Sequence, residues 1–256
     1  MVKDYLKPIL KNDKAMFLAY DHGFEHGPKD LIGKSFDPEY ILDLAVKGGY
    51  TGIILQKGMA EKYYTHTKYQ RQIPLILKLN GKTNLRSQEE PYAAINCSVA
   101  YAKKLGAQAV GYTIYLGSEY ETKMFEDFGR IQEEAHRLNM AAIAWIYPRG
   151  KAISNEFDPE IIRYAGRIGS ELGADLIKIK YPGSEETMRE VVKLAGKTKI
   201  VLSGGPQINE EEFLDEIKKV IQAGAIGVAV GRNVWQRDNA LEITEKIKKI
   251  IFLNSL

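Results

Sequence analysis

The chain has little of what marks secreted, membrane-bound or nucleic-acid-binding proteins. Its 256 residues include a single cysteine, Cys97, so no intramolecular disulfide can form, which fits a reducing compartment. No apolar run approaches the length of a transmembrane helix, and the first residues lack the apolar segment of a signal peptide. Lys and Arg number 36 against 33 Asp and Glu, a balance that argues against nucleic acid or a membrane as the main partner. We therefore expect a cytoplasmic protein.

What the chain does have is a regular succession of short apolar segments, each followed by an amphipathic stretch. The segments are rich in Ile, Val and Ala and end near Gly or Pro, as is typical of buried parallel strands. Eight such units in about 250 residues predict an α/β fold, a single (β/α)8 TIM-barrel domain over residues 1–256, with an open doubly wound sheet as the alternative. The expected strands are 16–21, 51–56, 75–79, 109–115, 142–147, 176–180, 200–203 and 227–230.

Helix boundaries are also readable. Asp37 and Asp158 each precede a Pro-Glu pair, which indicates a helix N-cap followed by proline in the first turn. Gly106, Gly173 and Gly224 lie where helices should end, and a strand begins soon after each. A last helix is expected over residues 241–253.

Two lysines lie at alternate positions of one expected strand, 176–180. Lys178 and Lys180 should share one face, toward the barrel interior, while the intervening isoleucines face the helices. A buried lysine without a partner is unfavourable, so either a carboxylate pairs with it, Asp21 and Asp175 being candidates, or chemistry uses it. A lysine in apolar surroundings beside a second cation can lose its proton near neutral pH and attack a carbonyl. Spacing alone does not say which lysine is the nucleophile.

Polar and aromatic residues gather at the expected carboxyl ends of the strands, where barrels of this kind hold their active sites. Asp21 ends the first strand, and Trp145, Tyr147 and Arg149 end the fifth. The seventh strand ends in Ser203-Gly204-Gly205 and the eighth in Gly231-Arg232. Glycine backbone and an arginine at these two positions predict a phosphate site, with two ordinary tight turns as the alternative.

One segment matches the spacing of a zinc-binding motif. His22, Glu25 and His26 fit the H-x-x-E-H pattern. That pattern needs a helix, which Gly23, Gly27 and Pro28 disfavour, so no metal ion is expected.

Seven strings together resemble the archaeal-type class I fructose-1,6-bisphosphate aldolases, Schiff-base enzymes related to deoxyribose-phosphate aldolase. The resemblance implies a lyase that needs neither metal nor cofactor and acts on a small phosphorylated sugar. It assigns the Schiff base to Lys178, substrate contacts to Asp21 and proton transfer to Tyr147. It also implies a large homo-oligomer, such as a decamer. The strings are residues 19–28, 75–83, 111–115, 147–150, 174–180, 203–206 and 231–237.

The same resemblance places the remaining site residues. Trp145 is expected to shape the pocket and Arg149 to serve the distal phosphate. Independently of the resemblance, repulsion between neighbouring cations predicts that Lys180 helps to keep the Lys178 amine uncharged. The 1-phosphate of the ketose is expected at Ser203, Gly204, Gly205, Gly231 and Arg232.

Three other functions stay open at this level. A related synthase of 2-amino-3,7-dideoxyheptulosonate would keep the imine and change the substrate. A sugar-phosphate isomerase would use a carboxylate base, with the lysines acting only through their charge. A barrel that binds sugar phosphates without turnover is the fourth reading.

Overall fold

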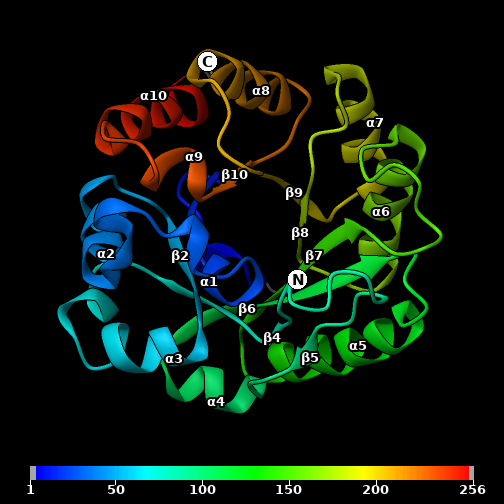
Figure 1. The fold of residues 1–256 in the computed structure, drawn as a ribbon, viewed down its shortest axis with the longest axis horizontal. Coiled ribbons are helices and arrows are strands. Elements are labelled where there is room, and N and C mark those ends of the chain that lie inside the picture. The colour runs from blue at the N-terminus through cyan, green and yellow to red at the C-terminus, as the bar shows by residue number, and fades with distance from the viewer. Residues whose placement is uncertain (1–3, 254–256) are drawn as a thin grey trace.

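The computed structural model describes residues 4–253, in which eight parallel strands close into a barrel (Figure 1). Going around the barrel, β1 is followed by β2, β3, β6, β7, β8, β9 and β10, which pairs with β1 again. The predicted (β/α)8 barrel is confirmed and the open sheet is wrong. The strands are β1 Ala15–Tyr20, β2 Gly52–Gln56, β3 Leu75–Lys78, β6 Ala107–Leu116, β7 Ala141–Pro148, β8 Leu176–Ile179, β9 Lys199–Ser203 and β10 Gly227–Val230.

Helices form a ring around the strands (Figure 1). The predicted caps are present: the Asp37 and Asp158 carboxylates accept hydrogen bonds from the amides two residues on, at 2.9 Å. The three predicted helix-ending glycines all have positive φ. The helices are α1 His22–Glu25, α2 Pro38–Lys47, α3 Lys57–Met59, α4 Val99–Lys104, α5 Glu121–Arg137, α6 Pro159–Glu171, α7 Glu185–Ala195, α8 Glu210–Gln222, α9 Arg232–Trp235 and α10 Ala240–Phe252.

The last helix, α10, packs on the barrel. Its buried face carries Ile243, Ile247 and Ile251, spaced as expected for one side of a helix. The Thr244 hydroxyl lies 3.0 Å from the Tyr50 hydroxyl at the start of β2, which ties the end of the chain to an early strand. No helix within the described range is long and apolar enough to span a bilayer.

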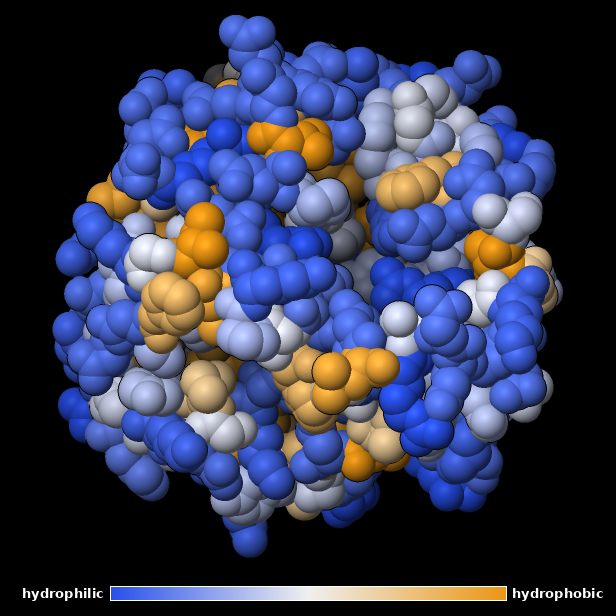
Figure 2. All heavy atoms as spheres, in the orientation of Figure 1, coloured by the Kyte–Doolittle hydropathy of each residue, from blue (hydrophilic) through white to orange (hydrophobic). Residues whose placement is uncertain are grey.

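The two ends of the barrel differ in character. At the amino-terminal ends of the strands, Leu6 and Ile9 pack against inward-facing apolar side chains, including Phe17 and Ile76. At the other end, a short hairpin of β4 Asn80–Gly81 and β5 Ala94–Ile95, absent from the sequence prediction, follows β3. The space-filling view shows a hollow near the middle of the molecule, bordered mainly by hydrophilic residues (Figure 2). The polar groups of the barrel therefore gather at one end.

Candidate active site

A cavity of about 740 Å³ opens at the carboxyl ends of the barrel strands. Of the residues predicted for the site, ten line it and Trp145 does not. The ten are Asp21, Tyr147, Arg149, Lys178, Lys180, Ser203, Gly204, Gly205, Gly231 and Arg232. The alternation of strand side chains, combined with barrel closure, thus brings together groups that lie up to 211 positions apart in the chain.

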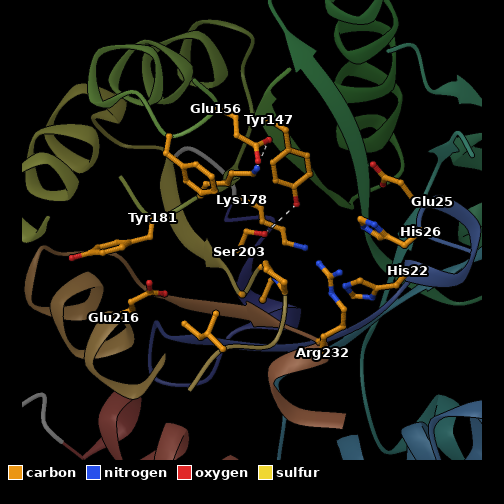
Figure 3. A pocket seen from close by; sticks show the side chains of 18 of the residues that line it. His22, Glu25, His26, Tyr147, Glu156, Lys178, Tyr181, Ser203, Glu216 and Arg232 are labelled. Carbon is orange, nitrogen blue, oxygen red and sulfur yellow. Dashed lines mark hydrogen bonds and ion pairs between the residues drawn. The ribbon is translucent and has the colours of Figure 1, made fainter. Parts of the chain in front are cut away.

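Lys178 extends from β8 into the middle of the cavity (Figure 3). Its side chain is 6 % exposed, and its Nζ lies 5.6 Å from the centre of the Trp145 ring on β7. Within the described residues, this ammonium group has no hydrogen bond or ion pair. Of the two outcomes expected for a buried lysine, a carboxylate partner is therefore wrong, and a role in chemistry is the one that remains.

The two carboxylates proposed as partners for this lysine are engaged elsewhere. Asp21 Oδ2 lies 3.2 Å from Nζ of Lys78, which extends inward from β3. Asp175 precedes β8 at the opposite end of the barrel, where it contacts His136 at 2.9 Å and accepts the Ala142 amide at 2.8 Å. Because Asp175 and Lys178 lie three residues apart on an extended strand, their side chains cannot meet.

Lys78 joins two buried carboxylates. Its Nζ lies 3.2 Å from Asp21 Oδ2 and 3.2 Å from Glu25 Oε2, and Glu25 also accepts the Tyr115 hydroxyl at 2.6 Å. Burial on its own would raise the carboxyl pKa values, but Lys78 and the other cations and hydrogen-bond donors around the two groups together outweigh it. The pKa of Asp21 therefore falls well below its usual range and that of Glu25 falls to about 2. Both carboxylates are therefore ionised at neutral pH, in the same cavity as Lys178.

Trp145 lies next to the two buried lysines, Lys78 and Lys178, without lining the cavity. Its ring centre lies 5.8 Å from Nζ of Lys78 and 5.6 Å from Nζ of Lys178, so both cations face one aromatic ring. The ring needs Gly111 on the neighbouring strand β6: a Cβ there would lie 1.5 Å from Cζ3 of the indole. Trp145 therefore positions the lysines and does not touch the cavity.

Lys180 lies just beyond β8 and lines the same cavity as Lys178. Its Nζ forms an ion pair with Glu156 Oε2 at 2.5 Å and lies 4.6 Å from the Phe157 ring centre. Arg149 lies at the same end of the cavity, 3.5 Å from Glu25 and 3.7 Å from Glu156. Burial lowers the pKa of Lys180, and Glu156 opposes that effect. Lys78, which faces the same indole ring as Lys178, is a second buried cation of the cavity.

Tyr147 on β7 points into the cavity next to Lys178 (Figure 3). Its hydroxyl lies 3.3 Å from the Ser203 hydroxyl at the end of β9, and either oxygen can donate. A phenol and a serine in contact can pass a proton between a substrate and the cavity. The predicted grouping of these residues with Lys178 is confirmed by the geometry.

An anion-binding arrangement lies on the other side of Lys178 from Glu156 (Figure 3). The Arg232 guanidinium forms an ion pair with Asp30 at 3.0 Å through one terminal nitrogen, while its buried Nε has no partner among the described residues. Gly205 has a φ of 64°, a conformation that favours glycine. The Gly204 N–H donates to the Ala229 carbonyl at 3.2 Å.

Asn233 fixes the turn that holds this glycine pair. Its side-chain amide donates to the carbonyls of Gly204 at 2.6 Å and Pro206 at 2.7 Å, and its oxygen accepts the Ile208 amide at 3.0 Å. All three polar positions of a buried side chain are used, so the turn after β9 is tied rigidly to α9.

The conformation around His22 and His26 differs from the one expected from the sequence. A single helical turn does form at His22–Glu25, so the expectation of no helix there is wrong. The Glu25 carboxylate, however, points to Lys78 and Tyr115, and the rings of His22 and His26 stack at 5.8 Å. Burial lowers the pKa of His22 to about 3, so its imidazole is neutral at pH 7.

Three site residues were missed from the sequence: Glu25, Lys78 and Glu156. Lys78 carried a usable signal, since it alternates with leucines on its strand just as Lys178 alternates with isoleucines. Glu25 stands out in the sequence only as part of the H-x-x-E-H pattern, which gives no sign of its contact with Lys78. Glu156 is in a loop without periodicity, and no local pattern links it to Lys180.

Comparison with known proteins agrees with this geometry. The sequence profile of the DeoC/LacD family aldolases matches residues 15–237. The class 1 fructose-bisphosphate aldolase of Thermoproteus tenax is 48% identical over 255 residues, which cover 98% of this chain and 95% of that protein. The corresponding protein of Halobacterium salinarum is 42% identical over 247 residues, 96% of this chain and 93% of that protein.

Among solved structures, the fold is similar to an archaeal fructose-1,6-bisphosphate aldolase whose catalytic Lys is covalently bound to the carbinolamine intermediate of the substrate. The TM-score is 0.92 at 48% identity, over 97% of this chain and 98% of that chain. With the profile match covering most of its length, the chain belongs to the DeoC/LacD family of aldolases.

Proposed function

We propose that this chain is a class I fructose-bisphosphate aldolase, which cleaves fructose 1,6-bisphosphate reversibly into dihydroxyacetone phosphate and glyceraldehyde 3-phosphate. The observation that carries the proposal is the unpartnered, buried Lys178 amine between two cationic ends of one cavity. A bisphosphate matches two such ends, and a ketone between them would meet the amine.

The reaction begins when the Lys178 amine attacks the C2 ketone. Loss of water from the carbinolamine gives an iminium ion, which withdraws electrons from the adjacent carbon. The C3–C4 bond then breaks: its electron pair moves into the iminium to form an enamine, and the C4 hydroxyl loses its proton as glyceraldehyde 3-phosphate leaves. Protonation at C3 and hydrolysis by water release dihydroxyacetone phosphate and restore the amine. The iminium acts as the electron sink, so the proposal includes no metal or cofactor.

The remaining side chains have matching roles in this proposal. Tyr147 moves the protons at the C4 hydroxyl and at C3, and its contact with Ser203 supports this assignment. Asp21, kept ionised by Lys78, orients the substrate hydroxyls. Arg232, together with the Ser203–Gly205 turn and Gly231, binds the 1-phosphate, while Arg149 and Lys180 bind the 6-phosphate. Trp145 acts indirectly, beneath the lysines.

Borohydride trapping tests the proposal. Reduction in the presence of dihydroxyacetone phosphate should join the substrate covalently to the peptide that carries Lys178, detected by mass spectrometry. Lys178→Met should abolish the adduct, whereas Lys180→Met, which alters the distal end of the cavity, should retain it. An adduct on Lys180, or aldolase activity without any trapped adduct, would contradict the proposed mechanism.

The proposal extends to the state of the protein in the cell. Residues 1–256 form one domain in the cytoplasm and assemble into a large homo-oligomer, with a decamer as the expected size. The profile match over residues 15–237 supports the single domain, and exposed apolar side chains such as Phe36 and Tyr164 support assembly.

A further inference from the structure

One oxygen atom joins the two cations at the far end of the cavity. Glu156 Oε2 lies 2.5 Å from Lys180 Nζ and 3.7 Å from a terminal nitrogen of Arg149. Both cations line the cavity, and Glu156 lies on the side of Lys178 away from Arg232 (Figure 3). An oxygen of an anion bridging a lysine and an arginine is the arrangement that a bound phosphate would adopt. Glu156 thus occupies the place of a ligand.

Two carboxylates, Glu25 and Glu156, form ion pairs with these cations, and only Glu156 is free to rotate away from them. Glu25 contacts Arg149 at 3.5 Å, but its side chain is buried and is also held by Lys78 and Tyr115. The Glu156 side chain is 37 % exposed, and within residues 4–253 its ion pairs are with these two cations. It lies in a turn of the segment between β7 and α6, where Asp158 N–H donates to the Asn155 carbonyl at 3.2 Å. A rotation of its side chain toward solvent would free both cations.

From this arrangement we infer that Glu156 is a displaceable counter-ion, which sets how strongly the enzyme prefers a substrate with a distal phosphate over one without it. This inference rests on the proposed function. A distal phosphate brings up to two negative charges to Lys180 and Arg149, so the Glu156 carboxylate must move away when it binds. A ketose 1-phosphate leaves the glutamate in place, so neither cation is left unpaired in a partly buried site.

Glu156 therefore reduces the preference of the enzyme for the bisphosphate over the monophosphate. Bisphosphate binding must break an existing ion pair, whereas binding of the monophosphate keeps it. Replacing the carboxylate by an amide of the same shape removes the competitor, and it withdraws the counter-ion on which the monophosphate complex depends. Both effects shift specificity toward the bisphosphate.

The test is steady-state cleavage of fructose 1,6-bisphosphate and of fructose 1-phosphate by the wild type and by Glu156→Gln. The KM for the bisphosphate should fall about fivefold, the effect of removing one partly exposed ion pair, with little change in kcat. The ratio of kcat/KM for the bisphosphate to that for the monophosphate should rise by at least as much. Glu216→Gln is the matched control, because Glu216 lines the same cavity and forms no ion pair in the described structure. It should leave the ratio within about twofold.

The outcomes separate this inference from the proposed function. A ratio that is unchanged or lower in Glu156→Gln, or one that rises equally in Glu216→Gln, would show that Glu156 does not compete with the distal phosphate. If the wild type cleaves neither sugar and forms no borohydride adduct, the proposed function itself is wrong and the inference falls with it. Because Glu156 is half-exposed on a loop, the variant should melt within a few degrees of the wild type, and the melting curve checks this.

Discussion

Lys78 is the cation shared by two buried carboxylates, Asp21 and Glu25. We therefore expect Lys78→Met to lower the stability of the barrel more than most single substitutions. The lysine side chain is 4 % exposed and lies 3.2 Å from both Asp21 and Glu25. Methionine fills a similar volume but removes the cation that the two buried carboxylates share, which leaves Glu25 with only the longer contact to Arg149 at 3.5 Å. Removing one partner from a buried charge network typically lowers the free energy of unfolding by about 3–5 kcal/mol. For a chain of this length that corresponds to a fall in Tm of roughly 10 °C.

The pH dependence of the same variant follows from the carboxyl pKa values. In the wild type the pKa of Glu25 lies at about 2 in the folded state, below its ordinary value of 4.5. This carboxylate therefore stabilises the fold above about pH 4.5, and the contribution is lost as the pH falls through about 2. Without Lys78, burial raises the pKa values of Asp21 and Glu25, so the folded state holds protons that the unfolded chain releases. The deficit in stability should be largest at neutral pH and shrink on acidification.

Urea unfolding followed by circular dichroism at several pH values measures this prediction. Lys180→Met is the matched control, since its partner Glu156 is half-exposed and the pair should contribute less than about 1 kcal/mol. Lys78→Met/Glu25→Gln should recover part of the lost stability, because one of the two buried carboxylates that lose Lys78 is then neutral. If Lys78→Met unfolds within about 1 kcal/mol of the wild type at pH 7, the argument for a charge network is refuted.

Two further predictions concern packing and assembly. Gly111→Ala should lower the unfolding free energy by roughly 3 kcal/mol or more in urea melts, because the new Cβ would overlap the Trp145 ring; Gly129→Ala on α5, with open space around its Cβ position, should be neutral or slightly stabilising, and equal effects at both glycines would contradict the packing argument. Light scattering coupled to size-exclusion chromatography should give a mass near ten chains, and a monomer across the accessible concentration range would rule out the proposed assembly.

Barrel closure could be predicted because it depends on local patterns that repeat. Each strand is a short apolar segment, and caps such as Asp37 and Asp158 mark where helices begin. The inward direction of Lys178 follows from the period of two in a strand and the burial of its isoleucine neighbours. The resemblance to known aldolases, and not the spacing, chose Lys178 over Lys180.

What could not be predicted depends on pairs of side chains from distant strands and loops. Lys78 and Glu25 are 53 positions apart, and their contact exists only because β1 and β3 both end at the same rim. Asp21 was a candidate partner for Lys178, but it forms its ion pair with Lys78, a second lysine that faces the barrel interior. Glu156 comes from an irregular loop, where neither periodicity nor propensity sets the direction of a side chain.

The apolar packing of Leu6 and Ile9 beneath the barrel has a kinetic consequence. With that end filled, we expect sugar and fragments to enter and leave at the rim that carries Lys178. Under the proposed mechanism, we expect the aldehyde fragment to leave first, because no covalent bond holds it after the C3–C4 scission. The three-carbon ketone fragment would then still be bonded to Lys178 and would be released only after hydrolysis. In the synthetic direction the same mechanism predicts that the ketone phosphate binds before the aldehyde.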